Sequence, residues 1–90
     1  MSVHEAISKH SQQQHRHLIR FEELDALREA AIEQAIDRCR RNEPFTVDEI
    51  NRITAAINEH AKHGISPTRK LVTPELVRAH VDSLRSPSST

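Results

Sequence analysis

The sequence has little of the chemistry on which many small proteins depend. Its 90 residues include one cysteine, one glycine, two phenylalanines and no tryptophan or tyrosine. One cysteine excludes a disulfide within the chain and a zinc site made of cysteines alone. A single glycine argues against a glycine-rich loop that lets the backbone approach a phosphate, and no nucleophile motif of the Gly-x-Ser-x-Gly type is present. We therefore expect no enzymatic activity, no catalytic residues, no cofactor and no bound metal.

An excess of charge of one sign and long apolar runs are also missing. Thirteen basic and thirteen acidic residues cancel to a formal net charge of zero with histidine neutral. This balance leaves no electrostatic footprint for nucleic acid or for an anionic membrane. No stretch is apolar enough to span a bilayer or to form the core of a signal peptide. We therefore expect a soluble, cytoplasmic protein that has no membrane partner.

Helical patterning with clear breaks is what the sequence does contain. Neither glycine nor proline occurs from residue 2 to residue 43, which predicts one long helix over about residues 3–41. Pro44 ends it, because the residue before a proline is pushed towards extended backbone. Apolar residues at helical spacing predict two shorter helices, over about residues 47–63 and 74–85, with Pro74 in the first turn of the last one.

These elements predict an all-α fold in a single domain over residues 1–85. The two shorter helices are expected to pack on the C-terminal half of the long one. Residues 86–90, with the sequence Ser-Pro-Ser-Ser-Thr, have nothing to bury and are expected to form a disordered tail.

Two signals predict how the second helix begins and ends. Thr46 and Glu49 have the spacing of a capping box, and Phe45 and Ile50 occupy the positions of a hydrophobic staple, so we expect these two apolar side chains to touch. Gly64 is expected in the left-handed conformation that commonly terminates a helix.

The long helix is too long for the rest of the chain to cover. Its length would be about 58 Å, whereas a compact chain of this size has a radius of gyration near ~12 Å. A mixed apolar and polar stripe at spacings of three and four residues fits a short coiled-coil seam. We therefore predict a homodimer through this stripe; the alternative is that residues 1–16 fray in solution. The stripe comprises Val3, Ile7, His10, Gln14, His17, Phe21 and Leu24.

Two side chains on the apolar face of the long helix invite specific predictions. Arg28 lies in the middle of that face, so we expect it to be buried or half-buried and paired with a carboxylate, with Asp25, Glu49 and Asp82 as candidates. Cys39 lies farther along the same face and is expected to be a small buried thiol.

Seven histidines raise the question of a metal site. His10 and His17 would lie about 10.5 Å apart along a helix, too far to share one tetrahedral ion, and His60 and His63 lack a further ligand at a recognised spacing. Solvated or interface histidines are therefore expected. The segment 66–70, Ser-Pro-Thr-Arg-Lys, could bind an anion or carry a phosphate, but its composition is more typical of a loop.

Four segments carry a resemblance to a known family: residues 1–4 (Met-Ser-Val-His), 43–51 (Glu-Pro-Phe-Thr-Val-Asp-Glu-Ile-Asn), 64–70 (Gly-Ile-Ser-Pro-Thr-Arg-Lys) and 72–75 (Val-Thr-Pro-Glu). Together they resemble the YpbS-like group of uncharacterised proteins from Bacillus-type bacteria, over most of residues 1–85. The resemblance implies a bacterial cytoplasmic protein. It brings no activity, cofactor or catalytic residue with it.

These observations favour a non-enzymatic, homodimeric protein-interaction or regulatory module, with an unidentified protein as a further possible partner. The alternative function is a nucleic-acid-associated protein, which the scattered basic residues make the less favoured of the two.

Overall fold

The structure is a computed structural model that describes the backbone of residues 3–85 and the side chains of residues 11–85. The chain forms helix α1 (Val3–Arg40), helix α2 (Asp48–His60), a short 3-10 helix η1 (Ala61–His63) and helix α3 (Pro74–Arg85). The predicted all-α fold, with one long helix and two shorter ones packed against it, is confirmed. The predicted tail over residues 86–90 lies outside the described residues.

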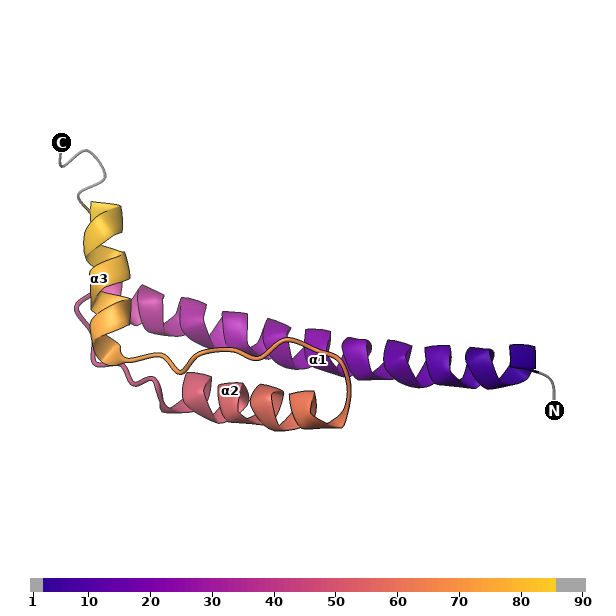
Figure 1. Ribbon diagram of the computed structural model, residues 1–90. Helices are drawn as coiled ribbons and strands as arrows, with labels where there is room; N and C mark the ends of the chain where they lie inside the picture. The colour runs from indigo at the N-terminus through magenta and orange to yellow at the C-terminus, as the bar shows by residue number, and fades with distance from the viewer. Residues whose placement is uncertain (1–2, 86–90) are drawn as a thin grey trace.

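The long helix makes the molecule elongated. α2 runs antiparallel to the C-terminal half of α1, and α3 crosses the end of that pair (Figure 1). The N-terminal part of α1 extends past every other element. The molecule measures 62 × 29 × 16 Å, with a radius of gyration of 18.2 Å. That radius is well above the ~12 Å of a compact chain of this length, as the excess length of the first helix predicts.

α1 ends in a backbone motif that uses an asparagine where glycine is more common. Asn42 has a φ of 60°, in the left-handed region that asparagine tolerates better than most residues. The Asn42 N–H donates to the Cys39 carbonyl at 3.1 Å, and the Glu43 N–H donates to the Arg38 carbonyl at 2.8 Å. This pair of bonds is the Schellman pattern, which satisfies two of the last carbonyls of α1 before Pro44.

The predicted start of α2 is only partly formed. The Asp48 N–H donates to the Thr46 hydroxyl at 3.3 Å, but Glu49 pairs with Arg52 at 2.6 Å rather than reaching back. Phe45 is half-buried and packs against the core cluster that contains Ile50. The reciprocal capping box therefore does not form, whereas the direct contact between Phe45 and Ile50 stays a prediction.

Gly64 corrects a prediction. Its φ is 177° and its ψ is −168°, which is extended backbone and not the left-handed conformation. The reason for glycine is instead a close approach, because a Cβ atom at this position would lie 2.7 Å from the imidazole ring of His17. α2 tightens into η1 at this end, and the chain then turns back under α1.

The core consists of two small clusters along α1. One contains Ala35, Val47, Ile50 and Val77, and the other contains Phe21, Leu24 and Ile57 with Ile53 packed against them. The expectation that Phe21 and Leu24 lack cover within the chain is therefore wrong. α2 reaches far enough back along α1 to bury both of them, at 9% and 7% exposure.

In the part of the chain that the structure describes, every helix is too short or too polar to cross a bilayer.

Candidate functional site

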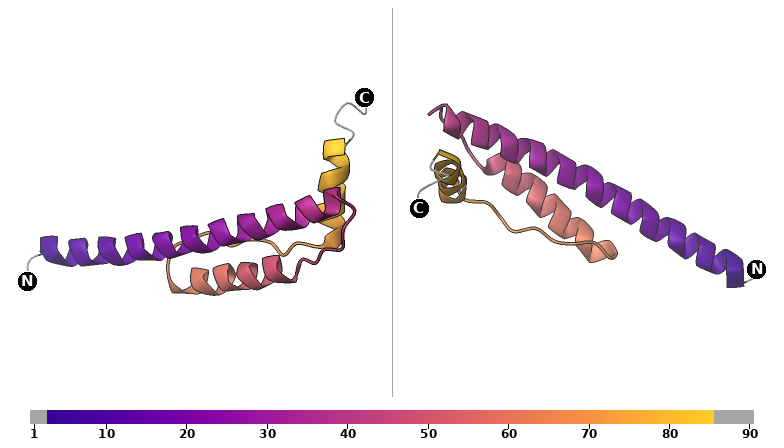
Figure 2. Two further views of the ribbon diagram at one scale, coloured as in Figure 1. Left: turned by 180° about the vertical axis from the view of Figure 1, so that it is seen from behind. Right: turned by 90° about the horizontal axis from the view of Figure 1, so that it is seen from above.

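The extended segment 64–73 is the most highly connected feature of the molecule outside the core. It leads from η1 to α3 and runs back along the α1/α2 pair, as the thin orange trace in Figure 1 shows. The right-hand view of Figure 2 places it along one side of that pair. We call residues 64–73 the strap.

Two asparagines of α2 hold the strap by its backbone. The Asn58 amide donates to the Arg69 carbonyl at 2.9 Å and accepts from the Arg69 N–H at 2.8 Å. The Asn51 amide makes the same pair of bonds with Val72, at 2.8 and 2.7 Å. Seven residues of helix and three residues of extended chain each span about 10 Å. The two asparagines are therefore spaced to match an extended peptide.

The strap also inserts one arginine between two side chains of α1. The Arg69 guanidinium donates to both oxygens of Asp25, at 3.0 and 3.4 Å, and lies over the Phe21 ring at 5.2 Å from its centroid. Both charged side chains are largely covered, with 34% and 23% of their surfaces exposed. A fork-shaped cation on a carboxylate and an aromatic face is a site that favours arginine over lysine.

Arg28 takes different partners from those predicted. It is half-buried, as expected, but it donates to the Thr54 hydroxyl at 2.8 Å and to the Lys70 carbonyl at 2.9 Å. The predicted carboxylate pairing is therefore wrong: of the candidates, Asp25 pairs with Arg69 and Glu49 with Arg52. Thr54 is fully buried, and its hydroxyl donates a hydrogen bond to the Ile50 carbonyl at 2.8 Å. Arg28 therefore connects the strap to the centre of α2.

The other end of the strap is held by residues predicted for the dimer seam. Gln14 donates to the Ile65 carbonyl at 2.8 Å, and His17 hydrogen-bonds the Ser66 hydroxyl at 2.9 Å. The His17 ring stacks on His60 with centroids 3.8 Å apart. The His60 Nε2–H donates to the His17 carbonyl at 2.8 Å, because a carbonyl can only accept.

The surroundings of His17 disfavour its charged form. Its partial burial lowers its pKa from the usual 6.5, and the positive charges of His60 and His63 lower it further. In its neutral form the ring can stack on its neighbour without charge repulsion. The site where α1, α2 and the strap meet therefore favours the neutral form of His17.

The seam as predicted thus divides into two parts. Gln14, His17, Phe21 and Leu24 make contacts within the chain. Val3, Ile7 and His10 belong to α1, but their side chains lie outside the described residues. Among residues 11–85, no cluster of three or more His, Cys, Asp or Glu side chains is arranged to hold a metal.

The opposite side of the α1/α2 pair carries a groove with a different character. It has a volume of about 460 Å³ and a mainly apolar floor. We call it the open groove; it is lined by Leu24, Leu27, Ala30, Ala31, Gln34, Glu49, Arg52, Ile53 and Ala56. Leu27 is 55% exposed, and Ala30 and Ala56 are exposed beside it. None of these lining residues hydrogen-bonds to the strap.

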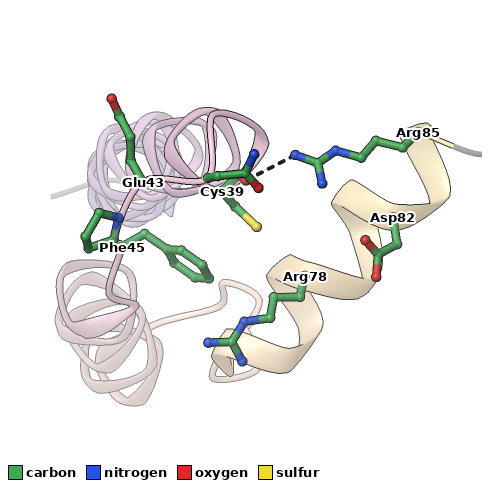
Figure 3. Close-up of a pocket in the computed structure, with 8 residues that line it drawn as sticks. Cys39, Glu43, Phe45, Arg78, Asp82 and Arg85 are labelled. Atoms are coloured by element: carbon green, nitrogen blue, oxygen red, sulfur yellow. Dashed lines mark hydrogen bonds between the residues drawn. The ribbon is translucent and has the colours of Figure 1, made fainter.

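A third hollow, of about 520 Å³, lies where α1 meets α3. Figure 3 shows the side chain of half-buried Cys39 turned towards α3, with Asp82 and Arg85 across from it on that helix. Arg85 donates to the carbonyl of Arg40 at 2.6 Å, and Arg78 lies over the Phe45 ring. Both arginines therefore have structural partners, and Arg85 caps the end of α1. Cys39 itself is less buried than predicted.

A hydroxyl and an imidazole meet where the strap begins. Ser66 and His17 form a hydroxyl–imidazole pair, which is the start of a nucleophile site. The His17 ring packs on a second imidazole rather than on a carboxylate that would orient it. The loop interpretation of residues 66–70 is also incomplete, because Arg69 is an anchor of the strap.

Sequence reasoning missed Asn51 and Asn58 entirely. Their spacing of seven residues puts both on one face of α2, which was an available signal. Their partners, Arg69 and Val72, could not be identified before the path of the strap was known.

Comparison with known proteins identifies the family but no activity. Residues 1–83 match the family described as "Protein of unknown function (DUF2533)", and the chain belongs to this family. It is 51% identical over 82 residues to the "Uncharacterized protein YpbS" of Bacillus subtilis (strain 168). The aligned region covers 91% of this chain and 96% of the relative. No solved structure matches.

Proposed function

We propose that this member of the DUF2533 family is a non-enzymatic, cytoplasmic interaction module that forms a homodimer through the open groove. The observation that supports this proposal is the unequal cover of the α1/α2 pair. The strap lies on one side of the pair, whereas the other side exposes Leu27 between two alanines. Small residues let another helix approach closely, and two such helix pairs can stack into a four-helix bundle.

The charges along α1 favour a second copy in antiparallel orientation. Arg20, Leu27, Ala30 and Asp37 follow one another along one flank of α1 at intervals of seven, three and seven residues. A two-fold axis between Leu27 and Ala30 would pair each of them with the other and would bring Arg20 opposite Asp37 of the second copy. Arg20 and Asp37 already pair with Glu23 and Arg41 of their own helix, so in the dimer each would share its charge with the second copy, and the flank is complementary to itself in sign.

Six of the ten arginines bond to other groups of the chain, which supports a protein partner over a nucleic acid. Arg20, Arg41 and Arg52 lie 3.2, 3.1 and 2.6 Å from carboxylates of their own helices. Arg28, Arg69 and Arg85 are used to hold the strap or to cap α1. A basic surface that tracks phosphates would need such side chains to be free and clustered.

Sedimentation equilibrium of the full chain at tens of micromolar tests the proposal. The wild type is expected to be a dimer, and Leu27→Glu a monomer, because a buried charge without a partner would oppose the contact. Leu71→Glu is the matched control, since Leu71 is 61% exposed on the strap and away from the groove. A monomeric wild type would refute the dimer, and a dimeric Leu27→Glu variant would place the contact elsewhere.

A further inference from the structure

The strap occupies its groove in the manner of a bound peptide. Its backbone groups at residues 65, 69, 70 and 72 are held by side chains of α1 and α2, as described above. Main-chain bonds of this kind give affinity for extended peptides, and pockets for individual side chains give specificity. Here the pocket is the one that Phe21 and Asp25 form around Arg69.

The strap is also a poor ligand for the surface beside it. Ile65 is 79% exposed and Leu71 is 61% exposed, so its two large aliphatic side chains contribute little burial. Its attachment depends on backbone bonds, on Arg69, on the Ser66 hydroxyl and on Val72, which packs against the core. A peptide that keeps the arginine and buries its apolar side chains would have an advantage over the strap.

We propose that the groove formed by Phe21, Asp25, Arg28, Asn51 and Asn58 is a recognition site for an extended, arginine-containing segment of a partner protein. In the free chain the strap fills this site and blocks it. The partner's arginine would take the place of Arg69 on Asp25 and Phe21, and its backbone would bond to Asn58 and, three residues later, to Asn51. This site is separate from the open groove and does not depend on the dimer.

Competition from the strap lowers the apparent affinity of the site for a partner. A partner can bind only the fraction of molecules in which the strap has left the groove, so its apparent affinity is reduced by that fraction. The strap is an exposed connection between helices, and such segments open at lower free energy than packed cores. Weakening the strap in the chain should therefore strengthen binding of the same segment added as a separate peptide.

A labelled peptide with the sequence of residues 64–73 tests the proposal by fluorescence anisotropy. It is expected to bind an Arg69→Ala chain at least about tenfold more tightly than the wild type. Replacing the peptide's arginine by alanine should weaken binding at least about tenfold, because it removes a charge-assisted hydrogen-bond pair. Asp25→Asn and Asn58→Ala, each combined with Arg69→Ala, should weaken it as well.

Leu27→Glu combined with Arg69→Ala is the matched control, because Leu27 lies in the open groove, and it should leave peptide binding unchanged. Circular dichroism checks that each variant keeps its helices. If Arg69→Ala loses them, Arg69→Lys replaces it, since lysine keeps the charge but lacks the two-nitrogen contact. A folded variant that does not bind the peptide, or that binds the alanine peptide equally well, would overturn the proposal.

Discussion

The two sides of the α1/α2 pair differ in the chemistry of their side chains and in whether the chain itself covers them. On the strap side, the helices present amide and charged groups, and five of them bond directly to the strap: Gln14, Asp25, Arg28, Asn51 and Asn58. On the open-groove side, they present leucine, isoleucine and alanine, and Leu27 is left more than half exposed. Polar groups that leave water need specific partners, whereas apolar groups need only cover. The strap side is therefore specified by geometry, and the open side is available for another surface.

On the strap side, the largest expected loss of stability comes from Gly64→Ala. The new Cβ would lie 2.7 Å from the His17 ring, and that ring is held by its stack on His60. We expect a loss of stability towards the upper end of the range of about 1–3 kcal/mol for overpacking, measured by urea unfolding. If His17→Ala is introduced as well, the cost should shrink, because the atoms that clash are gone. An equal cost in both backgrounds would contradict the close-approach explanation.

A smaller effect is expected from Asn58→Ala, which removes both bonds to the backbone of Arg69. Two net hydrogen bonds at about 1 kcal/mol each predict a loss of about 1–2 kcal/mol. Gln34→Ala in the open groove is the matched control, since Gln34 is exposed there and should change stability by no more than about 0.5 kcal/mol. Equal losses of stability in the two variants would contradict the view that the strap side depends on specific bonds and the open-groove side does not.

The smallest effect concerns pH at the corner of the strap. The pKa of His17 is lowered in the folded chain, so below its usual value of 6.5 the unfolded chain binds more protons at this position. Stability should therefore fall as pH drops through 6.5 towards the lower folded value. We expect the urea midpoint to be lower at pH 5.5 than at pH 7.5.

His17→Gln should flatten this dependence. Glu59, whose pKa is lowered mainly by its hydrogen bond to Lys62, loses its contribution only at more acidic pH, below its usual 4.5. Because pH 5.5 and pH 7.5 both lie above that value, a change in stability between them reports on His17 and not on Glu59. A pH dependence that His17→Gln leaves unaltered would assign the effect to another group.

Local chemistry was sufficient for the elements of the fold. The long helix, its end before Pro44 and the start of α3 at Pro74 each depend on a few neighbouring residues, and they were predicted to within one or two residues. The end of α2 was less accurate, because its last turn tightens into a 3-10 helix as the chain reverses. The excess length of α1 also followed from arithmetic on the sequence.

Local sequence patterns did not predict which residues far apart in the chain would contact one another. Arg28 was expected to pair with a carboxylate, with Asp25, Glu49 and Asp82 as candidates. The strap instead brings Arg69 to Asp25, and Arg28 bonds to two neutral oxygens. Phe21 and Leu24 were expected to face a second copy, but α2 covers them.

The sequence by itself determined the helices, their breaks and the mismatch in length, because these depend on backbone preferences within one or two turns. Only the tertiary structure decided which side of the α1/α2 pair the strap would cover. Several carboxylates and carbonyls offer an arginine similar partners, so the path of the chain selects among them. Once that path is fixed, Asn51, Asn58 and Gly64 each acquire a role that no local pattern specifies.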